Sequence, residues 1–210
     1  MFEYILEIFK LLIVLIVAIV PHEYAHGWVA NKLGDPTAKE AGRLTLNPLK
    51  HIDPFGTIIL PGILLTLMFL GMNKFLFGWA KPVPVNFARL QNPKRDMMLV
   101  GIAGPITNIL IAIVLIQLLK LNLFPSGQEL LQSAIFLNVL LAVFNMIPIP
   151  PLDGSRVVMG LLPNRWAYFY MQLEPYGILI VFALFYLGLF RNVVIPIVSV
   201  VGRFLGIEFS

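Results

Sequence analysis

The sequence has 210 residues and a formal net charge of +4; 59% of its residues are hydrophobic and only 12% are charged. Soluble domains are about 45–50% apolar and about 25% charged, so this composition excludes a disordered chain, a nucleic-acid-binding arm and a soluble enzyme with one compact core. The length leaves room for about five or six membrane helices, and we therefore expect an all-α polytopic membrane protein.

The first predicted helix lies near the N-terminus and is apolar from Tyr4 to Val20, apart from two charged residues. It lacks the basic region and the small-residue cleavage site that mark a secretory signal peptide. The helical pattern continues through His22 and His26 and ends near Gly34. We therefore interpret it as a membrane span that the protein retains.

Two segments follow that differ from ordinary spans. The apolar segment 55–72 is interrupted by Pro61 and Gly62, so it either crosses the bilayer or dips into it and returns. Backbone that turns at membrane depth is tolerated only where protein or a water-filled cavity covers it. The segment 78–86 alternates like a strand, and we expect it to form a small β-hairpin near the functional site.

The second half of the chain is predicted to contain four more apolar helices. Residues 97–119 and 130–147 are long enough to span the bilayer. The second of these runs into a proline-rich turn that contains Asp153. The shorter segments 176–190 and 193–207 are expected to pair as a helical hairpin.

The first span contains the pattern His22-Glu23-x-x-His26. Residues four apart share one face of a helix, so both imidazoles can bind one zinc ion, and Glu23 can take a proton from water on that ion. The alternative is a pair of histidines that only form hydrogen bonds within a helix bundle. An ionisable cluster inside an apolar span is costly and by default functional, which favours the metal site.

A catalytic zinc ion usually has three protein ligands and an open position for water. The chain has no cysteine, so the third ligand must be a His, Asp or Glu. Asp153 ranks first because it follows a long span, in a turn that can aim its carboxylate inward. His51 is the alternative, in a loop that could fold back toward the metal. Asp35 is typical of a turn, and Asp96 is typical of a helix N-terminus.

In these motifs the chain resembles the site-2 protease family of zinc intramembrane metalloproteases, in its minimal form without a sensor domain. The resemblance extends to about residue 160 and rests on three ordered motifs: His22-Glu23-x-x-His26, Gly104-Pro105-x-x-Asn108, and Asn145-x-x-Pro148 with Leu152-Asp153-Gly154. It implies that His22, His26 and Asp153 bind zinc and that Glu23 is the catalytic base. It also implies that Asn108 faces the active site and positions the substrate or polarises the scissile carbonyl.

The ligand positions predict how the chain crosses the membrane. A zinc–ligand bond is about 2 Å long, so the first span and the span before Asp153 must run parallel and end at one depth. This favours a re-entrant segment at 55–72. One face then collects most of the basic residues, which indicates that the zinc end faces the cytoplasm. Those residues are Lys32, Lys39, Arg43, Lys50, Lys74, Lys81, Arg89, Lys94, Arg95, Arg156 and Arg165, against Lys120 and Arg191 on the other face.

We therefore expect a single membrane-embedded metalloprotease domain over residues 1–210, with a catalytic core at about 4–160 and the C-terminal helical hairpin at about 175–208. The expected function is zinc-dependent hydrolysis of peptide bonds in or near transmembrane segments, at the cytoplasmic side of the cell membrane. The expected partners are transmembrane protein or peptide substrates and the lipid bilayer, and not nucleic acid. An extended substrate would add as a strand to segment 78–86.

Two other functions fit parts of the pattern. The same histidines could serve a metal-binding membrane protein or metal transporter without proteolytic activity. A transporter needs polar sites along a path through the bilayer, whereas here the acidic and imidazole groups gather toward one face. A relative that binds transmembrane helices without cleaving them is a third alternative, and the intact Glu23 argues against it.

Overall fold

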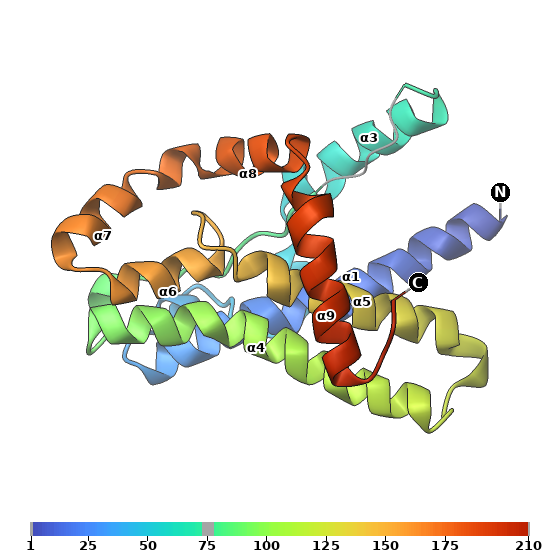
Figure 1. The fold of residues 1–210 in the computed structure, drawn as a ribbon, viewed down its shortest axis with the longest axis horizontal. Helices are drawn as coiled ribbons and strands as arrows, with labels where there is room; N and C mark the ends of the chain where they lie inside the picture. The colour runs from blue at the N-terminus through green and yellow to red at the C-terminus, as the bar shows by residue number, and fades with distance from the viewer. Residues whose placement is uncertain (1, 73–77, 210) are drawn as a thin grey trace.

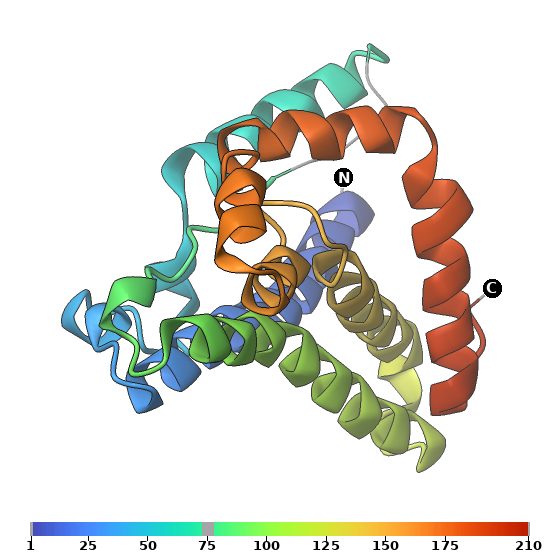
Figure 2. The same cartoon turned by 60° about the vertical axis from the view of Figure 1, so that its left-hand side comes forward.

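The computed structural model describes residues 2–72 and 78–209, and all regular structure in these residues is helical. Three long helices form its centre: α1 (Phe2–Lys32), α4 (Pro93–Lys120) and α5 (Gln128–Asn145). Gln91, just before α4, donates its N–H to the carbonyl of Leu33, just after α1 (3.1 Å), so α4 begins where α1 ends. In Figure 2 the start of α4 lies beside the end of α1, and in Figure 1 α1 and α5 both run from right to left, as expected, whereas α4 runs from left to right.

Small side chains allow the three central helices to approach one another closely. Ala18 of α1, Ala112 of α4 and Ala142 of α5 are all buried. In membranes, helices associate mainly through such close packing, because lipid tails compete with any larger apolar contact. A fully buried apolar cluster continues the interface toward the C-terminal helix and contains Ala112, Ile116, Ile135, Val139, Val194 and Val198.

Four helical segments among the described residues are long and apolar enough to cross a membrane: Leu6–Lys32, Pro93–Lys120, Pro125–Asn145 and Asn164–Tyr186. Their outer surfaces are apolar as well; Leu110 and Val114 of α4 are 56% and 58% exposed. Soluble proteins rarely leave large apolar patches uncovered, whereas lipid tails match them. The protein is thus a helical membrane protein, and the expectation of five or six spans is not confirmed beyond these four.

The apolar segment after α1 forms one short helix rather than a helix broken at Pro61. A π-helical turn, η2 (Pro54–Ile59), leads directly into α3 (Leu60–Phe69). Pro61 lies in the first turn of α3, where its missing N–H is tolerated, so the predicted break is wrong. The chain nevertheless comes back to its starting point, because Trp79 donates its N–H to the carbonyl of Gly56 (3.1 Å). Both ends of this excursion lie together, as a re-entrant segment requires.

The expected β-hairpin is not confirmed. Residues 78–86 contain no strand, and residues 73–77, which precede them, lie outside the described residues. Lys81 and Val83 already donate their N–H groups to partners that are not strands. The two prolines of this stretch have no N–H at all, so few donors remain for a ladder.

The C-terminal region continues from α5 through a proline-rich loop into α6 (Asp153–Leu161), α7 (Asn164–Met171) and α8 (Gly177–Tyr186). The last helix, α9 (Ile195–Leu205), turns away from α8 and packs on α5 (Figure 1). The predicted hairpin of the last two apolar segments is therefore wrong. The reason is that α9 buries its apolar face, including Val198, against the central helices instead of against α8.

Short helices occupy the connections between these elements. They are α2 (Thr37–Glu40), η1 (Pro48–His51), η3 (Phe87–Arg89), η4 (Pro125–Gly127), η5 (Glu174–Tyr176) and the π-helical turn η6 (Phe190–Val194). The first three lie in the connection between α1 and α4. These three short helices lie near the end of α1, whereas α3 extends away from it toward the side of the N-terminus (Figure 1).

Candidate metal centre

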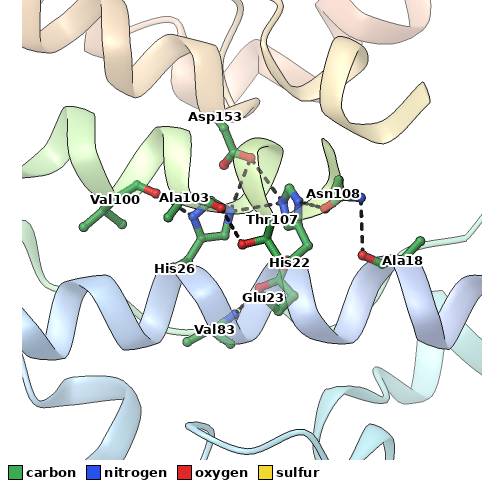
Figure 3. A network of polar contacts seen from close by, with 10 residues as sticks. All are labelled: Ala18, His22, Glu23, His26, Val83, Val100, Ala103, Thr107, Asn108 and Asp153. Carbon is green, nitrogen blue, oxygen red and sulfur yellow. Dashed lines mark hydrogen bonds and ion pairs between the residues drawn. The ribbon is translucent and has the colours of Figure 1, made fainter. Parts of the chain in front are cut away.

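His22 and His26 lie one turn apart on one face of α1, as their spacing predicts, and both are buried. Their Nε2 atoms are 3.0 Å apart. Asp153, at the start of α6, places its Oδ2 atom 3.2 Å from Nε2 of His22 and 3.3 Å from Nε2 of His26. Figure 3 shows the three side chains pointing toward one another. In the described part of the chain, this is the one group of three such side chains that could hold a metal ion.

The turn after α5 places Asp153. Leu152 has an extended backbone, and α6 begins at the next residue. Gly154 packs so tightly on the preceding loop that a Cβ atom there would lie 2.7 Å from the carbonyl oxygen of Ile147. Asp153 lies outside the candidate membrane spans, at the start of α6, and its side chain is directed at the two imidazoles.

The other ring nitrogen of each histidine is held by an oxygen of the protein. Nδ1 of His26 lies 2.7 Å from the carbonyl oxygen of Val100, and Nδ1 of His22 lies 2.9 Å from Oδ1 of Asn108. Asn108 also donates from Nδ2 to the carbonyl of Ala18 (3.4 Å), which fixes the direction of its amide. Both Nδ1 atoms thus face acceptors and carry the protons. The lone pairs are left on Nε2, directed at the third side chain.

This arrangement fits a zinc ion. Three ligands at about 2.0–2.1 Å from zinc in tetrahedral geometry lie about 3.3 Å from one another. The three separations here are 3.0, 3.2 and 3.3 Å. Two imidazole lone pairs and a carboxylate at these distances repel one another unless a cation lies between them. Oδ2 of Asp153 is in fact buried without a hydrogen-bond donor, as expected of an atom that faces a metal.

Gly104 of α4 has no side chain, and this leaves room for the two imidazoles. A Cβ atom at this position would overlap Nε2 of His26 and would lie 2.6 Å from Nε2 of His22. One turn earlier, Gly101 lets α4 approach α6 in the same way, because a Cβ there would lie 3.0 Å from the carbonyl oxygen of Asp153. The two glycines therefore allow α4 to pack closely against both the histidines of α1 and the start of α6.

Glu23 follows the first histidine in sequence and is partly exposed. Its Oε2 atom accepts a hydrogen bond from the N–H of Val83 (2.7 Å), so an extended segment from a distant part of the chain lies against this carboxylate (Figure 3). No residue in the described part of the chain donates a hydrogen bond to the second carboxylate oxygen of Glu23, which can therefore accept one from a water molecule or a substrate. This is the arrangement that a general base requires.

The other candidate residues lie elsewhere. His51 is buried, with Nε2 2.9 Å from the carbonyl oxygen of Thr45, and it does not join the cluster. The alternative of His51 as third ligand therefore finds no support. Asp35 accepts hydrogen bonds within its turn and from the N–H of Asn86, and Asp96 accepts the N–H of Asn92 at the start of α4, both as expected.

The family resemblance implies that Asn108 faces the active site and positions the substrate or polarises the scissile carbonyl. In the structure its amide lies at the candidate site, fully buried between His22 and Ala18, and its role toward a substrate stays a prediction. The hydrogen bond between Asn108 and Nδ1 of His22 orients this imidazole, which is a candidate metal ligand. The spacing of Gly104 and Asn108, one helical turn apart, already places both on one face of α4, but nothing in the sequence predicts the contact of Val83 with Glu23.

The sequence is similar to those of known zinc metalloproteases. The model of peptidase family M50 matches residues 125–189, which include Asp153. "Putative zinc metalloprotease YwhC" of Bacillus subtilis is 40% identical over 200 residues, which cover 90% of this chain and 85% of YwhC. No solved structure matches.

Two more distant relatives are longer than this chain. "Putative zinc metalloprotease Rip2" of Mycolicibacterium smegmatis is 32% identical over 63% of this chain and 49% of its own length. The zinc metalloprotease MJ0392 of Methanocaldococcus jannaschii is 29% identical over 75% of this chain and 36% of its own length. The similarity to Rip2 and MJ0392 thus covers about half and about a third of those proteins.

Proposed function

The chain belongs to peptidase family M50, the site-2 proteases, and from this premise we propose that it is an endopeptidase that cleaves its substrates within the membrane. As a member of this family it is a zinc metalloprotease. The proposal adds the location of cleavage, the residues that carry it and the class of substrate. The substrates are proteins or peptides with a transmembrane segment.

One observation carries the proposal. Nε2 of His22, Nε2 of His26 and Oδ2 of Asp153 form a triangle with the edges of a zinc tetrahedron, and Glu23 lies in the same helix turn. Two imidazoles and one carboxylate are a ligand set of catalytic zinc sites, which keep a further position open for water. We assign these three side chains as the ligands and Glu23 as the catalytic base.

The chemistry follows from these assignments. Zinc, when bound, supplies a Lewis acid that makes water acidic near neutral pH and polarises the scissile carbonyl. Glu23 accepts a proton from the attacking water as the new C–O bond forms at the carbonyl carbon. It then gives the proton to the amine nitrogen as the C–N bond breaks. Asn108 and the carbonyl of Val100 keep both imidazoles oriented throughout.

The position of the site supports a membrane-embedded substrate. Both histidines lie within α1, a helix long and apolar enough to cross the bilayer. A helical substrate hides its carbonyl groups in its own hydrogen bonds, so the scissile segment must be extended when it reaches Glu23. The extended stretch Trp79–Val85 lies beside Glu23, and its residues Lys81 and Pro82 are exposed. We propose that the substrate lies along this stretch.

We also propose that the site opens toward the cytoplasm. The connection between α1 and α4, at the site end of the bundle, carries exposed basic residues that include Lys39, Lys50 and Lys81. Lys120 ends α4 at the opposite end. Cytoplasmic loops of membrane proteins collect lysine and arginine, which favours this orientation in the cell membrane.

The test is the cleavage of a panel of membrane-spanning peptides by purified protein in bicelles, together with measurement of bound zinc. We expect about one zinc per chain and cleavage that stops on chelation and returns with added zinc. Glu23→Gln should retain zinc and lose activity by about 100-fold or more, because the base is gone while the ligands remain. Glu208→Gln makes the same chemical change at an exposed site outside the cluster and should cleave normally.

Three outcomes would contradict the proposal. Equal turnover by wild type and Glu23→Gln would remove Glu23 as the base. Retention of zinc by a variant lacking both His22 and Asp153 would remove the ligand assignment. Zinc flux into vesicles without any peptide cleavage would favour the alternative of a metal transporter.

A further inference from the structure

The backbone between Lys81 and Val83 is fixed on both sides next to Glu23. Lys81 donates its N–H to the carbonyl of His51 (2.9 Å), and its own carbonyl accepts a hydrogen bond from Nη2 of Arg43 (2.7 Å). Two residues later, Val83 donates its N–H to Oε2 of Glu23 (2.7 Å). We name residues 81–83 the base-contact segment.

Arg43 is a buried cation that has no carboxylate partner among the described residues. It is 7% exposed, and its guanidinium bonds to the carbonyl of Lys81 and lies 3.5 Å from that of Pro82. None of the ion pairs formed by the described residues includes it. Burial of a cation is costly unless hydrogen bonds compensate for it, and here the hydrogen bonds from Nη2 to the base-contact segment supply part of that compensation.

His51 supports the same segment from the other side. It is 3% exposed, and its Nε2 atom bonds to the carbonyl of Thr45, which ties down the loop between them. Its own carbonyl is then in place to accept the N–H of Lys81. The Arg43 side chain and the main-chain carbonyl of His51 therefore hold the carbonyl and the N–H of one residue, Lys81.

The segment needs this external support because of its composition. Pro82 and Pro84 have no N–H, so Val83 supplies the one main-chain donor among these three residues, and Glu23 takes it. The Val83 side chain packs on α1 at Gly27, where a Cβ atom would lie 2.9 Å from its Cγ1. The position of the Val83 N–H thus depends on Arg43, on His51 and on contact with α1.

We propose that Arg43 and His51 are positioning residues for the proposed proton transfer, and that they act through the N–H of Val83 on the carboxylate of Glu23. The inference rests on the proposed function, because it presumes that Glu23 is the base. The hydrogen bond to Oε2 fixes the rotamer of a long, flexible side chain and leaves the other oxygen to accept the proton. Misplacement of a reacting group by about 1 Å can cost about 100-fold in rate.

The first measurement is hydrogen exchange of the Val83 amide in zinc-loaded protein, which needs no substrate. In wild type we expect protection of this amide. In Arg43→Ala, the amide hydrogens of Val83 and Lys81 should exchange at least tenfold faster than in wild type. The amides of the central helices should keep their protection, and the zinc content should stay unchanged. Lys39→Ala removes an exposed cation four residues away and serves as the matched control.

The second measurement is steady-state cleavage of a membrane-spanning peptide. Arg43→Ala should lower kcat about tenfold to a hundredfold, because the change misplaces the base in the chemical step. KM should rise as well, since the proposed substrate lies along the same stretch, but by a smaller factor than kcat falls. Arg43→Lys keeps a cation that can reach one carbonyl, so it should recover part of the lost kcat and part of the Val83 protection. His51→Ala should resemble Arg43→Ala, with Lys50→Ala as its control.

The outcomes separate this inference from the proposed function. If the Val83 amide keeps its protection in Arg43→Ala, or if it loses protection while kcat is unchanged, the inference is wrong. A rise in KM without a fall in kcat would also overturn it, because the segment would then only bind substrate. If wild type cleaves no peptide, the proposed function fails, whereas the exchange measurement still tests whether Arg43 holds Val83 against Glu23.

Discussion

The two imidazoles of the metal centre are oriented in different ways. His26 bonds to a main-chain carbonyl, that of Val100, and no side-chain substitution removes this acceptor. His22 bonds to the side chain of Asn108, which is buried between α1 and α4. The orientation of His22 is therefore the part of the site that a single substitution in α4 can change.

Asn108→Leu tests this orientation. It replaces the amide with an apolar group of similar size, so Nδ1 of His22 loses its hydrogen-bond acceptor. Without that acceptor the imidazole is no longer held in the tautomer that leaves a lone pair on Nε2. Loss of such a contact typically lowers metal affinity about 10- to 100-fold, and we expect this range in a competition titration of zinc against a chelator. Thr107→Val is the control, because the only partner of the Thr107 hydroxyl among the described residues is the carbonyl of Ala103 in its own helix. Equal zinc affinity in Asn108→Leu and wild type would show that His22 does not depend on the amide.

Gly104→Ala tests the space beneath the imidazoles. The new methyl group would occupy the position of Nε2 of His26, so either the rings or α4 must move. We expect loss of most bound zinc and of cleavage together. The comparison is Gly127→Ala, where the added Cβ would make an ordinary contact of 3.6 Å with Phe124, and zinc content should not change. Full zinc occupancy in Gly104→Ala would contradict the close packing described here.

Single residues also show how much of the candidate site can be predicted from the sequence. The spacing of His22, Glu23 and His26 suffices to predict a shared helix face, because the helix repeat is a local property. Asp153 was predictable because few acidic residues follow a long span. The contact between Val83 and Glu23 was not, since it joins residues far apart in sequence and involves a main-chain N–H, which every residue except proline carries.

At the scale of elements, the return of the chain at Trp79 depends on two glycines. A Cβ atom on Gly56 would overlap the ring of Trp79, and one on Gly78 would lie 2.6 Å from the carbonyl oxygen of Gly56. These close contacts hold the start of η2 against the chain that leads to the base-contact segment. They lie outside the set of metal ligands.

Gly56→Ala should therefore separate activity from metal binding. We expect displacement of Trp79, a loss of cleavage of at least tenfold, and zinc content equal to wild type, because α1 and α6 carry the ligands. Gly62→Ala is the matched control, since a Cβ there meets no atom within 4 Å. The measurements are zinc analysis and peptide cleavage on the same samples. Loss of zinc in Gly56→Ala, or cleavage at the wild-type rate, would contradict this division.

The predicted helices were correct where hydropathy determines the structure and wrong where the packing between helices determines it. Long apolar runs predicted α1, α4 and α5, because membrane spans are dominated by composition. The parallel direction of α1 and α5 was predicted from the positions of the candidate zinc ligands. The break at Pro61 was wrong because proline is tolerated in a first helical turn. The prediction of a C-terminal hairpin was wrong because hydropathy does not specify which helices pack together, and α9 packs on α5.

At the scale of the whole molecule, the orientation in the membrane can be measured directly, since the chain has no cysteine of its own. Lys50→Cys lies at the site end, and Ser126→Cys lies in the connection between α4 and α5; both positions are exposed. In intact cells a membrane-impermeant maleimide should label the second cysteine and not the first, because the site end carries the basic loops. Inverted vesicles should reverse this pattern. Both positions should react in detergent, and labelling of both from the same side of the membrane would contradict the topology.

The ligands of the metal centre come from the first central helix and from the turn that follows the last one, so α4 and α5 separate them along the chain. During synthesis the imidazole pair leaves the ribosome before the carboxylate, because α4 and α5 lie between them in the chain. With the ligands assigned under Proposed function, a nascent chain that ends before α6 would lack the third one.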